Sequence, residues 1–197
     1  MADKINDWLY GEVELCGMKF KKGLFVLLSI FLVMVAVYLK PKTASDEAKY
    51  LMKNHIHPIA GIFTGWVEAS EKAEREAKSG WYGGVSKGVA QWTIKATMSG
   101  PSSSAALMTE SEIRKLKEYL DSNDIKHDET IKYGAMIIEW AEQGLDVYRK
   151  HEHYVECLFG NKAVLREAEK SVIIATDKFL GTSEAIKLHY DIITGAR

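Results

Sequence analysis

The residues of this sequence best suited to chemistry are its histidines, which include two His-x-His pairs, His55-Ile-His57 and His151-Glu-His153. Zinc and copper need several nitrogen or sulfur ligands at about 2.0–2.3 Å from the ion. Residues two apart on a helix point to different faces, so neither pair chelates an ion from a helix. His57 precedes Pro58, which favours an extended backbone and could let His55 and His57 converge.

A second combination of possible ligands comes from His153 and Cys157, which are four residues apart and therefore share one face of a helix. Two ligands do not make a metal site, and nothing in the sequence brings the two groups together. The alternative is that these imidazoles form ordinary local hydrogen bonds. The candidate metal ligands are His55, His57, His153 and Cys157.

Several familiar catalytic and nucleotide-binding motifs do not occur in the sequence. It contains no phosphate-binding GxxxxGK[ST] loop, no GxGxxG fingerprint, no HExxH helix and no C-x-x-C pair. The serines at 102–104 follow Pro101 and are interpreted as part of a linker over 99–104. We therefore expect a protein that is not an enzyme and that needs no cofactor.

The strongest pattern in the chain is the segment 23–39, in which 17 consecutive residues carry no charge and lysines stand on both sides. A helix of this length spans roughly 25 Å, and flanking lysines can extend it to the hydrocarbon thickness of a bilayer. A cleaved signal peptide has a shorter apolar core and a small-residue cleavage site, and a buried core helix rarely lacks a polar face for so long. The segment predicts one transmembrane helix.

The lysines near this segment are equally frequent on its two sides, so charge alone does not set the orientation. The three lysines closest to its N-terminal boundary favour a cytoplasmic N-terminus, and we expect a single-pass protein of the bacterial inner membrane. Residues 1–22 have no net charge and form either a short amphipathic helix at the membrane surface or a loosely ordered tail.

The remaining residues, 43–197, show the spacing of amphipathic helices. A capping box at Thr43–Asp46 opens the first helix, and Pro58 starts or kinks the next one. Gly100 and Pro101 are expected to end a helix, and Gly181 another. Apolar residues repeat with heptad spacing over 128–158, which favours packing inside a bundle. The predicted fold class is all-α, with one N-terminal transmembrane helix followed by a helical-bundle-like soluble domain over 43–197.

The charge balance limits the partners of the protein. The chain has 26 Lys and Arg against 27 Asp and Glu, a formal net charge of −1. A nucleic-acid-binding protein usually carries a broad basic surface, so we expect no nucleic acid partner. Two cysteines in 197 residues exclude a disulfide scaffold.

Two features suggest association with other proteins. Gly61 and Gly65 are four residues apart in an apolar stretch, a spacing that lets helix backbones approach closely, although an ordinary core helix explains it too. Large aromatic residues surround the glycine-rich turn near residue 80, and such residues are enriched at interfaces. The candidate interface residues are Gly61, Gly65, Trp66, Trp81, Tyr82 and Trp92.

The sequence thus favours a non-enzymatic single-pass membrane protein that acts as a structural or accessory subunit of a larger membrane complex, of the secretion, conjugation or respiratory kind. Its expected partners are the membrane and other subunits of the complex, or a second copy of itself. Two alternatives remain open: a membrane-anchored metal or haem binding protein, and an oligomerising membrane-active effector of lysis or defence.

Overall fold

The computed structural model describes residues 12–15, 18–21, 30, 31, 34, 42–79, 86–122 and 125–196. The chain divides into two compact units, Met1–Lys42 and Thr43–Arg197.

The first unit contains an antiparallel pair of short strands, β1 (Glu12–Leu15) and β2 (Met18–Lys21), in which Val13 lies opposite Phe20. The sequence of these residues alternates between apolar and charged, which is the two-residue period of a strand. The sequence left open a short helix or a loosely ordered tail for residues 1–22, and these two stretches are strands.

The predicted transmembrane segment, 23–39, lies outside the described residues except for Ile30, Phe31 and Met34, which are helical and exposed. Among the residues that the structure describes, no helix combines the length and the apolar character needed to cross a membrane. The transmembrane assignment thus stays a prediction.

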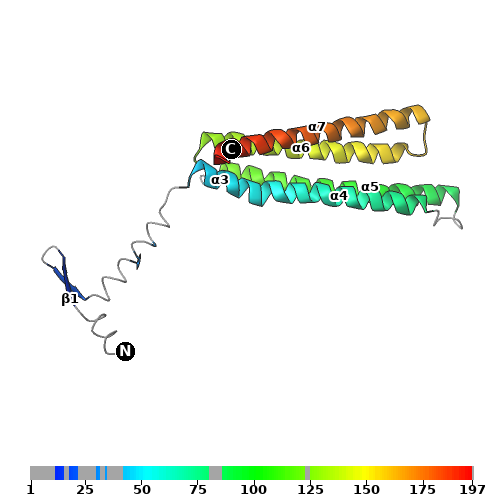
Figure 1. Ribbon diagram of the computed structural model, residues 1–197. Coiled ribbons are helices and arrows are strands. Elements are labelled where there is room, and N and C mark those ends of the chain that lie inside the picture. Colours follow the sequence, from blue (N-terminus) through cyan, green and yellow to red (C-terminus); the bar gives the residue numbers. More distant parts are fainter. Residues whose placement is uncertain are drawn as a thin grey trace. The chain divides into compact units, whose positions relative to one another are not determined.

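The second unit is all-helical over its described residues and forms an elongated antiparallel bundle (Figure 1). Four long helices lie lengthwise beside one another, with α6 and α7 paired against α4 and α5, and the short helix α3 lies at the end where the chain also terminates. The helices are α3 (Ala44–Leu51), the π-helix η1 (Met52–Ile56), α4 (His57–Lys78), α5 (Lys87–Asp121), α6 (Asp128–Cys157) and α7 (Lys162–Thr194). The all-α class and the bundle are confirmed for this unit.

The start of α3 follows the predicted capping box. The Oγ1 atom of Thr43 accepts from the Asp46 N–H at 3.2 Å, and the Asp46 carboxylate accepts from the Thr43 N–H at 3.1 Å. Both bonds satisfy backbone donors that the first helical turn leaves free.

Pro58 is preceded by a π-helical turn, and the chain between Ala44 and Lys78 continues as helix. A proline removes one backbone donor, and its ring clashes with the carbonyl four residues earlier. The wider π turn places the N–H of His57 on the carbonyl of Met52, five residues back, which relieves this crowding.

Helix α5 continues through Gly100 and Pro101, so the predicted linker over 99–104 is wrong. Local propensity disfavours a helix at this point by about 3 kcal/mol for proline alone. Tertiary contacts offset that cost, because Ser102 is fully buried and bonded to helices on both sides.

Helix α7 likewise continues through Gly181, where a helix end was predicted, and stops at Gly195, whose φ of 68° is left-handed. Phe179 and Ile186, on either side of Gly181, are both buried in the core. Burial of these side chains keeps the segment helical across the glycine.

The predicted heptad seam of α6 forms the centre of the core. Tyr133, Ile137, Trp140 and Val147 are buried, and Gly144 leaves room for the ring of Phe179 from α7. A Cβ atom at position 144 would lie 3.2 Å from that ring, which is tighter than most such contacts. Position 144 of the seam thus has no side chain, and the Phe179 ring packs against α6 at this position.

Candidate functional site

The structure places the first candidate ligand pair in two different environments. His55 is buried, with 6% of its surface exposed, whereas His57 is exposed. Within the described part of the chain, neither ring nitrogen of His55 has a hydrogen-bond partner. The His55 ring lies 5.7 Å from that of Tyr119 and 6.2 Å from that of Tyr50, centre to centre. His55 therefore occupies an aromatic pocket and does not converge with His57.

Burial lowers the pKa of His55 below its ordinary value, and Lys115 acts in the same direction while Glu112 opposes it. In the unfolded chain this imidazole titrates near its ordinary value, so the folded state disfavours the charged form. The contribution of neutral His55 to the free energy of unfolding is therefore at its maximum above about pH 6.5. It decreases as the pH drops below this value.

We predict that His55→Phe stabilises the bundle by about 1–2 kcal/mol at neutral pH and weakens the loss of stability between pH 7 and 5. The substitution removes a buried polar group without partners and keeps an aromatic ring beside Tyr50 and Tyr119. Denaturant unfolding followed by circular dichroism at several pH values measures both effects. The matched variant His57→Phe, at the exposed position, should leave the neutral-pH stability nearly unchanged.

The second candidate pair shares a helical face, as predicted. The Nε2 atom of His153 lies 3.8 Å from the Sγ atom of Cys157, near the C-terminal end of α6. Nearby, Lys95 of α5 donates to the carbonyl of Glu156, whereas His55 packs against Tyr119, 24 residues further along α5 and thus about 36 Å away. The structure does not bring the four candidate ligands together. Among the described residues, no group of three or more His, Cys, Asp and Glu side chains is placed to hold a metal ion.

A buried polar network joins three helices at a place that the sequence interpretation assigned to a linker. The indole N–H of Trp66 in α4 donates to Oγ of Ser102 in α5 at 2.8 Å, and Ser102 Oγ lies 2.8 Å from Nδ1 of His151 in α6. Oγ accepts from Trp66 and keeps its own hydrogen for Nδ1, an arrangement that fits a His151 ring with its hydrogen on Nε2. Burial lowers the pKa of His151, against the opposing effect of Glu152 and Glu74, and this favours the neutral ring.

This network contains a serine hydroxyl and a histidine, the groups that form a nucleophile and its base, but a substrate has no access to the serine oxygen. Serine hydroxyls become nucleophiles when a histidine accepts their proton and a substrate can reach the oxygen. Ser102 has no exposed surface, and its oxygen already accepts from Trp66. The arrangement holds α4, α5 and α6 together beside the turn at Pro101, and it also explains why α5 remains helical there.

We predict that Ser102→Ala lowers the free energy of unfolding by about 1–3 kcal/mol, because it leaves the Trp66 donor and the His151 ring nitrogen without a partner in the core. Thermal unfolding of the full chain measures the loss. Ser104→Ala, two residues on at an exposed position, is the matched control and should change the stability by less than about 0.5 kcal/mol. Equal effects of the two variants would show that the network does not stabilise the fold.

Another serine lies in a sequence with the letters of the G-x-S-x-G nucleophile motif, Gly84-Val-Ser86-Lys-Gly88. That motif requires a strand before the serine and a helix after it, with a histidine in reach. Ser86 is exposed and directly precedes α5, and the described residues provide no hydrogen-bond partner for its side chain. Of the three features that the motif requires, the described residues thus show only the helix after the serine.

The candidate interface residues separate into buried and exposed ones. Trp66 is 8% exposed and belongs to the core, whereas Trp92 is 71% exposed. The assignment of these residues to an interface stays a prediction. Trp81 and Tyr82 lie outside the described residues. Gly61 and Gly65 are exposed and line an apolar groove of about 500 Å³ between α4 and α5, together with Pro101 and Met108.

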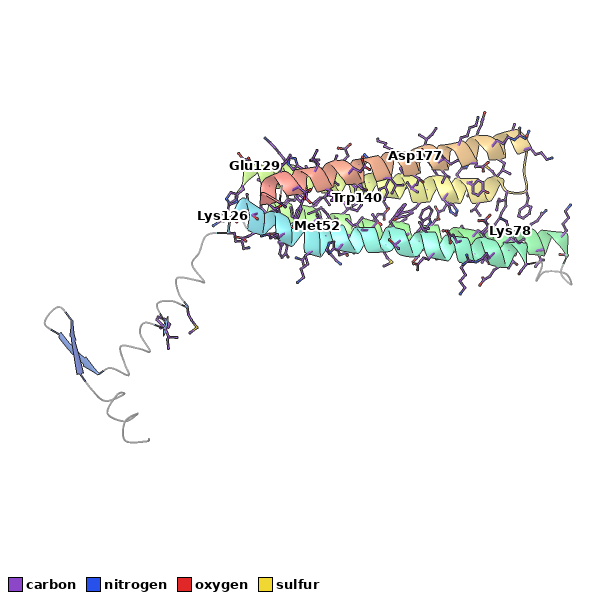
Figure 2. The ribbon with its side chains drawn as sticks, viewed as in Figure 1. Met52, Lys78, Lys126, Glu129, Trp140 and Asp177 are labelled. Atoms are coloured by element: carbon purple, nitrogen blue, oxygen red, sulfur yellow. The ribbon has the colours of Figure 1, made fainter. Side chains whose placement is uncertain are left out.

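The buried carboxylate of Glu47 was not anticipated from the sequence. It bonds Lys126, which lies at the end of the bundle where Met52 lies and opposite the end at Lys78 (Figure 2). Glu47 of α3 has no exposed surface, and its Oε1 accepts from the Lys126 N–H at 2.9 Å while Oε2 lies 3.1 Å from Nδ1 of His127. Burial alone would raise the pKa of Glu47, but the Lys126 N–H and the side chains of His127 and Thr130 outweigh it and lower the pKa. Glu47 thus joins α3 to the start of α6.

Comparison with known protein families, with curated proteins and with solved structures finds no match to this chain.

Proposed function

We propose that this protein is a non-enzymatic, single-pass membrane protein whose helical domain serves as a structural subunit of a larger membrane assembly. The observation that carries the proposal is the uncharged segment 23–39 with lysines at both boundaries. Ile30, Phe31 and Met34, its described residues, are helical and expose about half of their side-chain surface. An apolar helix of this kind needs lipid or protein around it.

The surface of the bundle supports a role in association. Large apolar side chains are exposed on α5 and α7, among them Trp92 at 71%, Leu107 at 69% and Ile174 at 66%, and such side chains can serve as contacts for other proteins. The groove beside Gly61 and Gly65 adds a second apolar surface, on the α4 and α5 side of the bundle.

The membrane assignment is tested by extraction of isolated membranes with alkaline carbonate. We expect the native chain to stay in the membrane fraction, and the double variant Phe31→Lys, Met34→Asp to move largely to the soluble fraction, because charges near the bilayer centre cost several kcal/mol. The double variant Phe31→Leu, Met34→Leu is the matched control and should behave as the native chain. Release of the native chain by carbonate would contradict the proposal.

A further inference from the structure

A cleft between α4 and α6, which the function proposed above does not use, lies toward the end of the bundle at Lys78 (Figure 2). It consists of two adjoining cavities, of about 240 and 250 Å³, which share Glu74, Met98 and Tyr154 as lining residues. Ligand sites in proteins usually occupy about 300–1,000 Å³, so either cavity alone is small for a ligand and the two together reach this range.

Three aromatic rings line the first of these cavities. The Trp66 ring lies 5.4 Å from the His151 ring at an interplanar angle of 88°, and the His151 ring lies 6.0 Å from that of Tyr154, centre to centre. The hydrogen bond to Ser102 holds the His151 ring in place, and burial favours its neutral form by lowering its pKa. Uncharged rings beside one another offer a surface that attracts both cations and apolar groups.

The first cavity also carries negative charge. Its described lining residues include the carboxylates of Glu71 and Glu74 and no lysine or arginine. Burial raises the pKa of Tyr154, and the negative charges of Glu169 and Glu74 raise it further. Lys78 acts on this pKa in the opposite direction. Carboxylates of two helices, α4 and α7, thus act on the aromatic lining of the cavity.

The second cavity is mostly apolar. Ile94, Leu158 and Phe159 line it. The ammonium group of Lys78 lies 2.6 Å from the carboxylate of Glu74, which lines both cavities. An ion pair between exposed side chains contributes little to stability, so a ligand cation can compete with Lys78 for this carboxylate.

We propose that this cleft binds a small organic ammonium ion, with its charge beside Glu74 and the aromatic rings of the first cavity and its apolar body in the second cavity. Aromatic rings attract alkylammonium groups through cation–π interactions, and the carboxylate supplies the counter-charge. The same carboxylates disfavour an anionic ligand of similar shape. The inference goes beyond the structural role proposed above and does not depend on it.

Titration calorimetry of the full chain in mild detergent, with 2-phenylethylammonium chloride as the probe, tests the proposal. The probe joins a positive charge to an apolar ring, and we expect a dissociation constant below about 1 mM. 2-Phenylethanol, an uncharged analogue of the same size, should bind at least about tenfold more weakly. No binding of the ammonium probe at about 10 mM, or equal binding of the two probes, would overturn the proposal.

Variants of the lining residues assign the binding to this cleft. Glu74→Gln should raise the dissociation constant of the ammonium probe by about tenfold, because it removes the counter-charge. Glu76→Gln, at an exposed position that does not line either cavity, is the matched control and should leave the dissociation constant unchanged. Equal binding by the native chain and Glu74→Gln would overturn the proposal.

Removal of the competing ammonium group gives a change in the other direction. Lys78→Met should lower the dissociation constant by about threefold, because it frees Glu74 from its ion pair. Unspecific destabilisation of the bundle would weaken binding instead. Weaker binding by Lys78→Met would therefore overturn the assignment of the ligand charge to Glu74.

Discussion

Replacement of Trp66 by alanine is expected to lower the free energy of unfolding by about 3–5 kcal/mol, the usual cost of removing a large buried aromatic side chain. The Trp66 ring packs 5.4 Å from Phe63 and 5.3 Å from Tyr148, centre to centre, and its N–H bonds Ser102 at 2.8 Å. Trp66→Ala therefore leaves a cavity where α4, α5 and α6 meet and removes one of the two hydrogen-bond partners of Ser102. Denaturant unfolding of the full chain in mild detergent measures the loss.

Trp92 provides the matched control because it is the same residue type at 71% exposure. Trp92→Ala should change the stability by less than about 0.5 kcal/mol, whatever it does to association. If the two tryptophan variants destabilised the bundle equally, or if Trp66→Ala folded as stably as the native chain while losing its partners, the assignment of Trp66 to the core would be wrong.

Replacement of Glu47 by alanine is the second large effect that we expect, a loss of about 2–4 kcal/mol. The substitution removes the acceptor of the Lys126 N–H and the negative charge beside His127, and it empties the space of a side chain that has no exposed surface. The Nδ1 atom of His127 is itself buried, so it loses its charged neighbour at a buried position. Glu68→Ala, at an exposed position on α4, is the control and should have little effect.

The same carboxylate should make the fold sensitive to acid. The pKa of Glu47 is lowered in the folded chain from its ordinary value of 4.5, so the folded state prefers the ionised form. The stabilisation that ionised Glu47 provides is therefore at its maximum above about pH 4.5. It is lost as the pH falls through the pKa of Glu47 in the folded chain. Unfolding measured from pH 6 to pH 3 should show a shallower loss for Glu47→Gln than for the native chain; parallel curves would contradict the account.

Local signals in the sequence predicted much of the bundle. The capping box at Thr43 and Asp46 and the apolar seam through Tyr133, Ile137 and Trp140 lie where the sequence placed them. Both signals depend on residues within one helix, either through bonds to the first turn or through side chains at helical spacing. Such patterns do not need knowledge of the neighbouring helices.

The errors occurred where contacts between distant residues outweigh local propensity. Pro101 and Gly181 both favour a helix end, yet Ser102 is bonded to Trp66 and His151, and Phe179 is packed against Trp140. No spacing in the sequence relates a serine at 102 to a tryptophan 36 residues earlier. The burial of Trp66 was missed for the same reason, since an aromatic residue at helical spacing fits a core as well as an interface.

The candidate metal ligands illustrate the same limit for sites. The sharing of a helical face by His153 and Cys157 follows from their spacing and is confirmed. The burial of His55 without a hydrogen-bond partner depends on Tyr50, Tyr119 and the π-helical turn before Pro58, which the sequence did not reveal. Binding of a metal by these residues stays a prediction.

The central claim is that this chain is a structural subunit of a membrane assembly, and the most direct test is the mass and composition of the particle extracted from native membranes in mild detergent. We predict a particle much larger than two 22.1 kDa chains, with several other proteins that remain bound through purification. A particle that contains this chain alone, as a monomer or as a homo-oligomer, would contradict the claim.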